Sequence, residues 1–194
     1  MCSRYQFVFE NLEKWNTLIF KASQQQNLGK WTGGEIAPGM EAPVFVAKDG
    51  QVKICFQRWG IPVSSGRIVI NARAETVCER PLFKDAVLYR RCVVPTTGFY
   101  EWDASRHRYL FKNSSEKELY LAGVYDSKQG RDCFVILTTS PNDSVRAIHD
   151  RMPMVLTKFQ VRAWLNDAQQ AIQLLQQVPP ELESMCEDGQ LSLW

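Results

Sequence analysis

Cysteine at position 2 has the most distinctive chemistry in this 194-residue chain. Once Met1 is removed, Cys2 carries a free α-amine and a thiol on adjacent carbons. The reference pKa of an α-amine is about 7.7–8.0, so a useful fraction is the neutral nucleophile near pH 7. The amine can form an imine with an aldehyde, and the thiol can then close a thiazolidine ring. Because any chain can carry cysteine here by chance, Cys2 alone leaves the function open.

A polar segment, 71–76, follows a run that predicts a strand. The short side chain of Asn71 at a strand end can orient a nucleophile. Arg73 can bind a phosphate through its planar guanidinium. The same pattern is typical of a turn in which Asn71 caps backbone groups.

Glu101 is the one carboxylate in the aromatic segment 98–102. Burial among these neighbours would raise its pKa and make it a proton shuttle. The alternative is a surface glutamate paired with Arg106 or Arg108.

His149 stands in a polar cluster with Asp150 and Arg151, and it is one of two histidines in the chain. Histidine is the side chain whose unperturbed pKa suits acid–base work at neutral pH. His107 is isolated, so His149 is the better candidate, with a purely structural histidine as the alternative. Trp59, beside Arg58, suits stacking on an exposed base, although a buried core tryptophan gives the same pattern.

Several classes of site and protein are excluded by the sequence. The six cysteines form no Cys-x-x-Cys pair and read as reduced thiols, mostly core filler. No Cys or His neighbours either histidine at ligand spacing, so we expect no metal site. Phosphate-loop, dinucleotide-binding and α/β-hydrolase motifs are missing, and we expect no cofactor. No apolar run reaches the ~18 residues that span a bilayer, and residues 1–5 lack a signal-peptide pattern, which predicts a cytoplasmic protein.

Basic residues are concentrated in the middle of the chain. Residues 53–112 carry eleven Lys or Arg and five Asp or Glu, against a net charge of +2 for the whole chain. This excess fits a polyanion such as nucleic acid, and it fits equally a solvated, asymmetric surface.

The remaining sequence must supply the elements that hold these residues. Residue periodicity predicts helices at 11–23, 79–88, 142–148 and 159–177, the last with a break near Asn166. It predicts strands at 43–47, 52–59, 67–71, 91–96, 109–112, 119–125 and 133–139. We expect a loop at 24–34, a turn at 36–39 and an extended tail from about 179 to 194. Strands and helices mix without regular alternation or a linker, which predicts one α+β domain over 1–194.

Taken in order, six segments resemble the SOS-response-associated peptidase (SRAP) family. The start, Met1–Arg4, is similar to the family's Met-Cys-Gly-Arg. The next three similarities are an Ile-Ala-Pro turn at 36–38, a Trp-Gly pair at 59–60 and an Asn-Ala-Arg-x-Glu-Thr motif at 71–76. The last two are an Arg-Cys-x-x-Pro segment followed by Gly-Phe-Tyr-Glu-Trp at 91–102, and a Thr-Thr pair followed by Ile-His-x-Arg-Met-Pro at 138–153. They span residues 1 to about 165.

The resemblance implies an α+β fold with a β-rich, barrel-like core of mixed or antiparallel sheet flanked by helices. It implies capture of abasic sites in single-stranded DNA as a thiazolidine crosslink through Cys2, with lyase-like activity and removal of the chain's own Met1. In this interpretation Asn71 positions the amine, and Glu101 and His149 handle protons. The residues that hold phosphates and bases are Arg4, Trp59, Arg73 and Arg151. We expect a monomer, associated with the nucleoid.

Two positions depart from the family pattern: Ser3 replaces glycine, and Glu35 replaces the asparagine before Ile-Ala-Pro. Ser3 adds bulk beside the nucleophile, and an exposed Glu35 would weaken phosphate binding slightly. Two other hypotheses stay open, a cysteine peptidase using Cys2 with His149, and a non-covalent binder of single strands using the basic region and Trp59.

Overall fold

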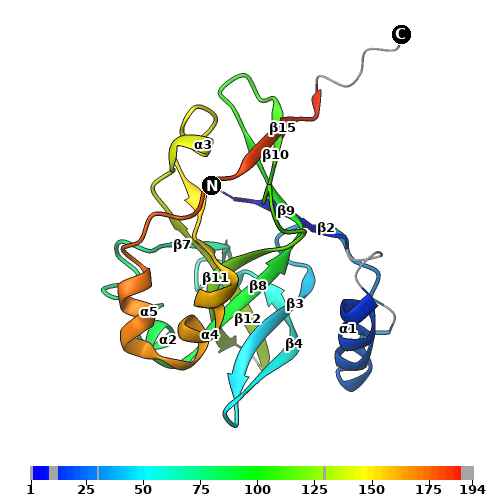
Figure 1. Cartoon of the computed structure of the whole chain (residues 1–194). Coiled ribbons are helices and arrows are strands. Elements are labelled where there is room, and N and C mark those ends of the chain that lie inside the picture. The colour runs from blue at the N-terminus through cyan, green and yellow to red at the C-terminus, as the bar shows by residue number, and fades with distance from the viewer. Residues whose placement is uncertain (1, 9–12, 30, 129, 189–194) are drawn as a thin grey trace.

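The centre of the fold is a closed ring of five strands, seen in a computed structural model that describes residues 2–8, 13–29, 31–128 and 130–188 (Figure 1). The ring runs β12-β4-β3-β8-β11, and pairing of β11 with β12 closes it. Pairing is antiparallel throughout this ring except between β12 and β4. The strands are β3 (Glu41–Lys48), β4 (Gln51–Trp59), β8 (Arg91–Thr96), β11 (Leu119–Lys128) and β12 (Arg131–Thr139). The expected barrel-like, mixed sheet of an α+β fold is confirmed.

Short strands extend this ring at its edges. β7 (Asn71–Arg73) pairs in parallel with β12, and this pairing fixes the start of the 71–76 segment against the barrel. β13 (Met152–Pro153) pairs with β12, and β14 (Val155–Leu156) pairs with β11. β5 (Ile61–Pro62) and β6 (Ile68–Val69) form a separate two-stranded sheet.

A second, fully antiparallel sheet lies beyond one end of the barrel, and β9 and β10 rise from it in Figure 1. Its order is β15-β10-β9-β1-β2, so the first strand of the chain lies between two partners. The members are β1 (Arg4–Phe7), β2 (Gly34–Ile36), β9 (Gly98–Trp102), β10 (Arg108–Lys112) and β15 (Glu183–Cys186).

One hydrophobic core joins the two sheets. Phe99 of β9 and Phe111 of β10 stack with ring centroids 5.1 Å apart, and both rings are fully buried. Tyr5 of β1 reaches Trp59 at the end of β4, with ring centroids 5.1 Å apart. Contacts of this kind fix the position of the second sheet, and therefore of β1, relative to the barrel.

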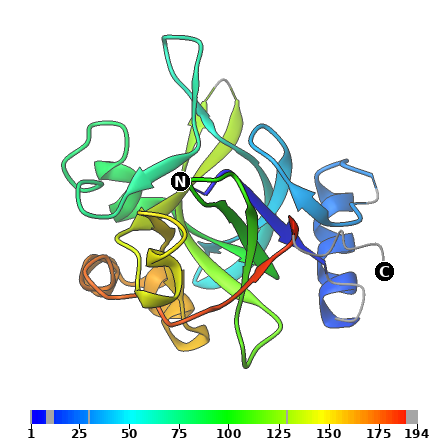
Figure 2. The same cartoon turned by 90° about the horizontal axis from the view of Figure 1, so that it is seen from above.

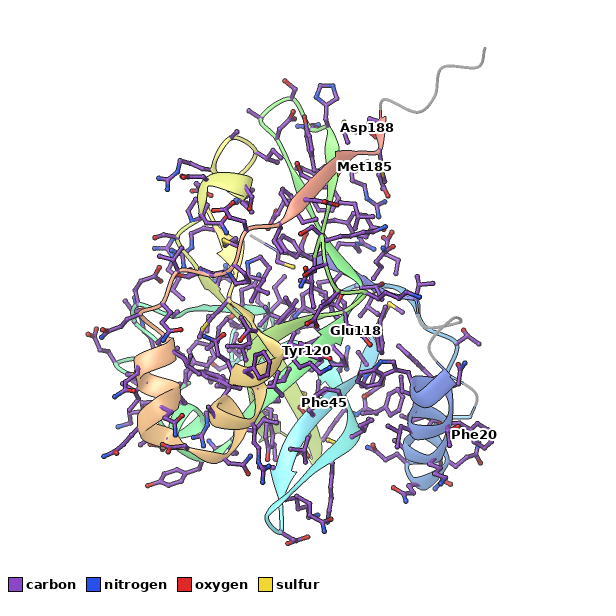
Figure 3. All side chains as sticks on the ribbon, in the orientation of Figure 1. Phe20, Phe45, Glu118, Tyr120, Met185 and Asp188 are labelled. Atoms are coloured by element: carbon purple, nitrogen blue, oxygen red, sulfur yellow. The ribbon has the colours of Figure 1, made fainter. Side chains whose placement is uncertain are left out.

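Helices cover two opposite sides of the strands, α1 (Glu13–Gln25) on one and α4 (Lys158–Asn166) with α5 (Ala168–Leu174) on the other (Figures 1 and 2). Trp15 of α1 stacks on Phe45 with ring centroids 5.3 Å apart, and its indole N–H donates to Glu118 at 2.8 Å. Figure 3 shows Phe45, Glu118 and Tyr120 together at this contact, with Phe20 on the outer side of the helix. The two remaining helices are α2 (Lys84–Tyr89) and α3 (Asp143–Arg146).

The predicted break near Asn166 is confirmed. Asp167 separates α4 from α5, and its carboxylate accepts hydrogen bonds from the amides of Gln169 and Gln170. This N-cap starts α5 in a new direction.

Other expectations were wrong in part. The helix predicted at 79–88 begins only at Lys84, because turns occupy 74–79 and the chain passes Pro81 before the helix starts. Strands β1, β2 and β9 were not predicted. Residues 11–12 of the first predicted helix lie outside the described part of the chain.

Cys2, Cys92 and Cys133 are buried, Cys55 and Cys186 are half-buried, and Cys78 is exposed; all six are free thiols. In the described ranges, no helix is long and apolar enough to cross a membrane.

Candidate active site

Asn71 and Cys2 are joined across 69 positions of sequence. The Asn71 side-chain amide donates a hydrogen bond of 2.8 Å to the carbonyl oxygen of Cys2. Asn71 is the first residue of β7, and the pairing of β7 with β12 fixes its backbone, while Cys2 lies two residues before β1. Within the described residues, the other polar atom of this side chain, Oδ1, is buried and accepts no hydrogen bond. Asn71 therefore holds residue 2 with its donor and offers a free acceptor.

Glu101 lies on β9 and faces the interior. It pairs in register with Tyr109 and is 2% exposed, since alternate residues of β9 point into the core. Burial raises the pKa of Glu101 to about 7, because the charged form loses its hydration. The alternative of a surface glutamate paired with Arg106 or Arg108 is wrong.

Close packing at the start of β9 explains why position 98 of the aromatic motif is glycine. A Cβ on Gly98 would lie 2.8 Å from the Phe111 carbonyl oxygen and 2.8 Å from Leu110. Only glycine fits so close to β10 at this position, and this close packing fixes the start of the strand that carries Glu101.

His149 lies after α3, with its Nε2 3.8 Å from Glu101 Oε2. The Arg151 backbone amide donates to His149 Nδ1 at 3.0 Å, and Asp150 Oδ1 also lies 3.0 Å from Nδ1. Because Nδ1 accepts from the amide in the neutral ring, Nε2 is the nitrogen turned toward Glu101. Burial lowers the pKa of His149, so the neutral form dominates at pH 7.

Cys2 is fully buried beside these groups. Burial, and then the negative charge of Glu101, raises the pKa of its thiol well above the ordinary value. The thiol therefore keeps its proton at neutral pH until a neighbouring base removes it.

Arg151 is tied into the site by Glu75. Its two terminal nitrogens donate to the two carboxylate oxygens at 2.7 and 2.9 Å, and Nη2 also donates to the Thr138 carbonyl at 2.7 Å. The Arg151 side chain is 13% exposed. This pair connects the His149 loop to the 71–76 segment and β12. The sequence motif contained Glu75, but nothing in it showed which arginine the carboxylate would meet.

The other predicted DNA-binding residues divide into two groups. Arg73 is exposed at the end of β7, and Arg4 is partly exposed on β1, 3.3 Å from Glu35. Trp59, in contrast, is fully buried, and its indole N–H donates to the Ile70 carbonyl at 3.0 Å. Base stacking by Trp59 is therefore corrected to a core role, because its ring packs between Tyr5 and Phe134.

Cys2, Asn71, Glu101 and His149 thus come together from four separate parts of the chain. They place a thiol, an amide with a free acceptor, a carboxyl of pKa about 7 and a neutral imidazole around residue 2. Such a set can hold an amine, deliver a proton and remove one.

The chain that carries this arrangement matches a known family. The SOS response associated peptidase (SRAP) model matches residues 1–187, and the chain belongs to that family.

Its relatives include YoqW of Bacillus subtilis (strain 168), an "abasic site processing protein", 31% identical over 146 residues. That match covers 68% of this chain and 65% of YoqW, so it spans just under two thirds of the relative. YedK of Escherichia coli (strain K12) is 22% identical over 139 residues, with 67% and 63% covered. HMCES of Xenopus tropicalis is 27% identical over 124 residues, covering 50% of this chain and 37% of that protein.

Solved structures share the fold. A crystal structure from Bacteroides thetaiotaomicron has a TM-score of 0.76 at 21% identity, covering 95% of this chain and 91% of the other. A second, from Bordetella bronchiseptica, has the same TM-score and identity, with 95% and 99% covered.

Proposed function

We propose that this protein processes abasic sites in single-stranded DNA, forming a covalent thiazolidine crosslink through Cys2 after Met1 is removed. Relatives whose names describe abasic site processing support the reaction class. The family's description as a peptidase fits a chain that removes its own Met1.

The observation that carries the proposal is the double use of Asn71. Its Nδ2 binds the Cys2 carbonyl, and its Oδ1 is a buried acceptor without a donor among the described residues. A buried polar atom left unsatisfied is costly. The α-amine that Met1 removal creates on Cys2 is a donor on the same residue, and its binding to Oδ1 would direct the nitrogen lone pair at an aldehyde.

Proton transfer divides between the two titratable residues. An abasic sugar is mostly a closed hemiacetal, and it must open before the amine can attack. His149, neutral at pH 7 with Nδ1 accepting from the Arg151 amide, carries its proton on Nε2 and donates a hydrogen bond from it to the ring oxygen of the sugar as the hemiacetal opens. Glu101, with a pKa of about 7, is partly protonated and delivers a proton to the hydroxyl that leaves as water when the imine forms.

In the ring-closing step, Glu101 accepts the proton of the Cys2 thiol. Glu101 has become a carboxylate after giving up its proton, and its charge acts on the neighbouring Cys2 thiol. Loss of water leaves a protonated imine, whose nitrogen keeps the hydrogen that it carried before. The carboxylate accepts the thiol proton while sulfur bonds to the imine carbon, and the C=N electron pair moves to the nitrogen, which becomes the neutral ring amine. Overall, aldehyde and aminothiol combine with loss of one water, and Glu101 ends protonated as it began.

Arg4 and Arg73 are the side chains that we propose to contact DNA phosphates near Cys2. Arg73 ends the strand that begins with Asn71, and Arg4 follows Cys2 by two residues. Arg151 can contribute only if a phosphate shares or replaces Glu75.

The test mixes the protein with a single-stranded oligonucleotide that contains one abasic site. A heat-stable covalent band is expected, and it should disappear when borohydride reduces the sugar aldehyde beforehand. Intact mass of the purified protein should show that Met1 is absent. Cys78→Ala, which removes an exposed thiol outside the site, serves as the matched control and should crosslink like wild type.

Two outcomes would reject the proposal. Non-covalent retention of the strand without a covalent band would favour a plain DNA-binding protein. Cleavage of an added protein substrate that depends on Cys2, without any DNA adduct, would favour a cysteine peptidase.

A further inference from the structure

Two arginines share one carboxylate on the outer face of the second sheet. Arg4 Nη1 lies 3.3 Å from Glu35 Oε1, and Arg108 Nη2 donates to the other oxygen, Oε2. The side chains of Arg4, Arg108 and Glu35 are 40%, 27% and 39% exposed, so the cluster faces solvent.

Strand register explains the cluster. Glu35 pairs with Gln6, Arg4 pairs with Tyr100, and Arg108 pairs with Trp102. Directly paired residues of antiparallel strands, and residues two apart on one strand, place their side chains on the same face. Arg4, Glu35 and Arg108 therefore share the face opposite to the one that carries Glu101.

Arg108 is held flat by aromatic rings. Its guanidinium carbon lies 3.7 Å from the Tyr100 ring centroid and 6.0 Å from that of Trp102. Its Nε lies 3.2 Å from the Glu187 carboxylate, and its backbone amide donates to Asp188, labelled in Figure 3, at 2.6 Å. A guanidinium stacked in this way presents its N–H edge sideways, which is the geometry that binds phosphate oxygens.

The two arginines of this face are already paired with acidic groups. Arg4 and Arg108 contribute two positive charges, Glu35 and Glu187 contribute two negative ones, and Asp188 at the Arg108 backbone amide adds a third negative charge. A phosphate that approaches either arginine meets a carboxylate already in its place. Because these ion pairs are exposed, they exchange readily with another anion.

We propose that Glu35 occupies the position of a DNA phosphate on Arg4 and Arg108, and thereby lowers the non-covalent affinity of this protein for undamaged single strands. The inference rests on the DNA binding in the proposed function and adds Glu35 as a specificity-determining residue and Arg108 as a phosphate contact. Weak non-covalent binding lets the protein leave intact DNA, whereas an abasic aldehyde is retained by covalent bonds that Glu35 does not affect. Selectivity for damage rises accordingly.

The experiment measures fluorescence anisotropy of a labelled, undamaged single strand over a series of salt concentrations. Glu35→Gln keeps the size of the side chain and removes its charge. We expect it to bind roughly three- to tenfold more tightly at low salt, with a log–log salt slope steeper by ~0.7 for each phosphate gained. Combining Glu35→Gln with Arg108→Gln should cancel most of the gain.

Asp49→Asn is the matched control. It removes one negative charge from the β3–β4 turn, at the end of the molecule remote from β9 (Figure 1), where Asp49 pairs only with Lys53 among the described residues. Its affinity and slope should equal those of wild type. An equal gain in Asp49→Asn and Glu35→Gln would reduce the effect to net charge and overturn the inference.

The experiment distinguishes failure of the Glu35 inference from failure of the proposed covalent reaction. A gain in Glu35→Gln binding from a protein that never crosslinks abasic DNA would support this inference and reject the covalent reaction. Normal crosslinking with unchanged affinity and slope in Glu35→Gln would reject this inference alone. Thermal melting of each variant, compared with wild type, verifies that all proteins measured are folded.

Discussion

The two faces of the second sheet use the same strands for opposite electrostatic purposes. On the inner face, Glu101 is buried, and its pKa is raised to about 7. On the outer face, Arg108 and Glu35 are partly exposed and paired with each other. Since neighbouring residues of a strand point to opposite faces, one register change would exchange these roles. Desolvation makes the inner face suited to moving protons, while solvent makes the outer face suited to exchanging anions.

The most severe test of the inner face is Cys2→Ala. We expect complete loss of the heat-stable adduct, because no thiol remains to close the ring on the imine. The α-amine of the substituted alanine can still form an imine, so borohydride should trap a reduced adduct on abasic DNA. The same unreduced, heat-stable band from Cys2→Ala would show that another residue is the nucleophile.

Glu101→Gln should have the next largest effect. We expect crosslinking to slow by ~10²–10⁴-fold, the usual contribution of a positioned acid, with nearly the full final yield because an aminothiol reacts with free aldehydes unaided. The wild-type rate should fall as pH rises through about 7, since Glu101 then loses the proton that it donates. Time courses from mildly acidic to mildly basic pH measure both effects.

His149→Ala provides the comparison for that pH profile. The pKa of His149 is lowered by burial, and its neutral form is the active one, so the wild-type rate should also fall below a pH under the reference value of about 6.5. The alanine variant should lose this acidic limb and keep the basic one. If both variants match wild type at every pH, these residues only shape the pocket.

Arg151→Ala examines an ion pair whose arginine, 13% exposed, is less exposed than Arg4 and Arg108 on the outer face. Because Arg151 also donates to the Thr138 carbonyl, we expect a loss of about 1–2 kcal/mol in the free energy of unfolding, measured with urea. Arg151 lowers the pKa of Glu75, so the stabilisation is present above the unfolded value of about 4.3 and fades as pH falls below it.

The matched control for that measurement is Arg146→Ala. Arg146 is 67% exposed and pairs with Asp143, which is 90% exposed, so its removal should change stability by less than about 0.5 kcal/mol. Equal costs for the two variants would show that burial of the arginine adds nothing to the stabilisation by its ion pair.

The smallest expected effect belongs to Arg73→Ala. Removing one phosphate contact should flatten the log–log salt slope of single-strand binding by ~0.7. Lys53→Ala removes a cation of β4 that pairs with Asp49 of the β3–β4 turn, and it should leave the slope unchanged. An unchanged slope in Arg73→Ala would remove this residue from the DNA surface.

Short-range sequence signals identified the residues that the fold brings together in the candidate site better than they predicted the surrounding elements. Cys2, Asn71, Glu101 and His149 were identifiable because each combines a reactive group with a distinctive local pattern, and family resemblance then connected them. Glu101 also illustrates a local rule that holds, since aromatic neighbours on a strand do bury a carboxylate.

What failed depends on partners distant in sequence. The pattern around Trp59 is the same for a stacking platform and a core residue, and only packing by Tyr5 and Phe134 decides between them. The pairing of Glu35 with Arg4 and Arg108 depends on the order β10-β9-β1-β2, which nothing local to Glu35 encodes. Short strands such as β1 carry too few residues to show an alternation.

The position of β1 between β9 and β2 has a mechanical consequence. In the proposed reaction, DNA becomes attached at Cys2, two residues before a strand that is hydrogen-bonded along both sides. Tension on the DNA would therefore pull along the strand and load both ladders in shear, so that their bonds resist together instead of opening one after another. The sheet would therefore resist rupture most strongly when the DNA is pulled along the axis of β1.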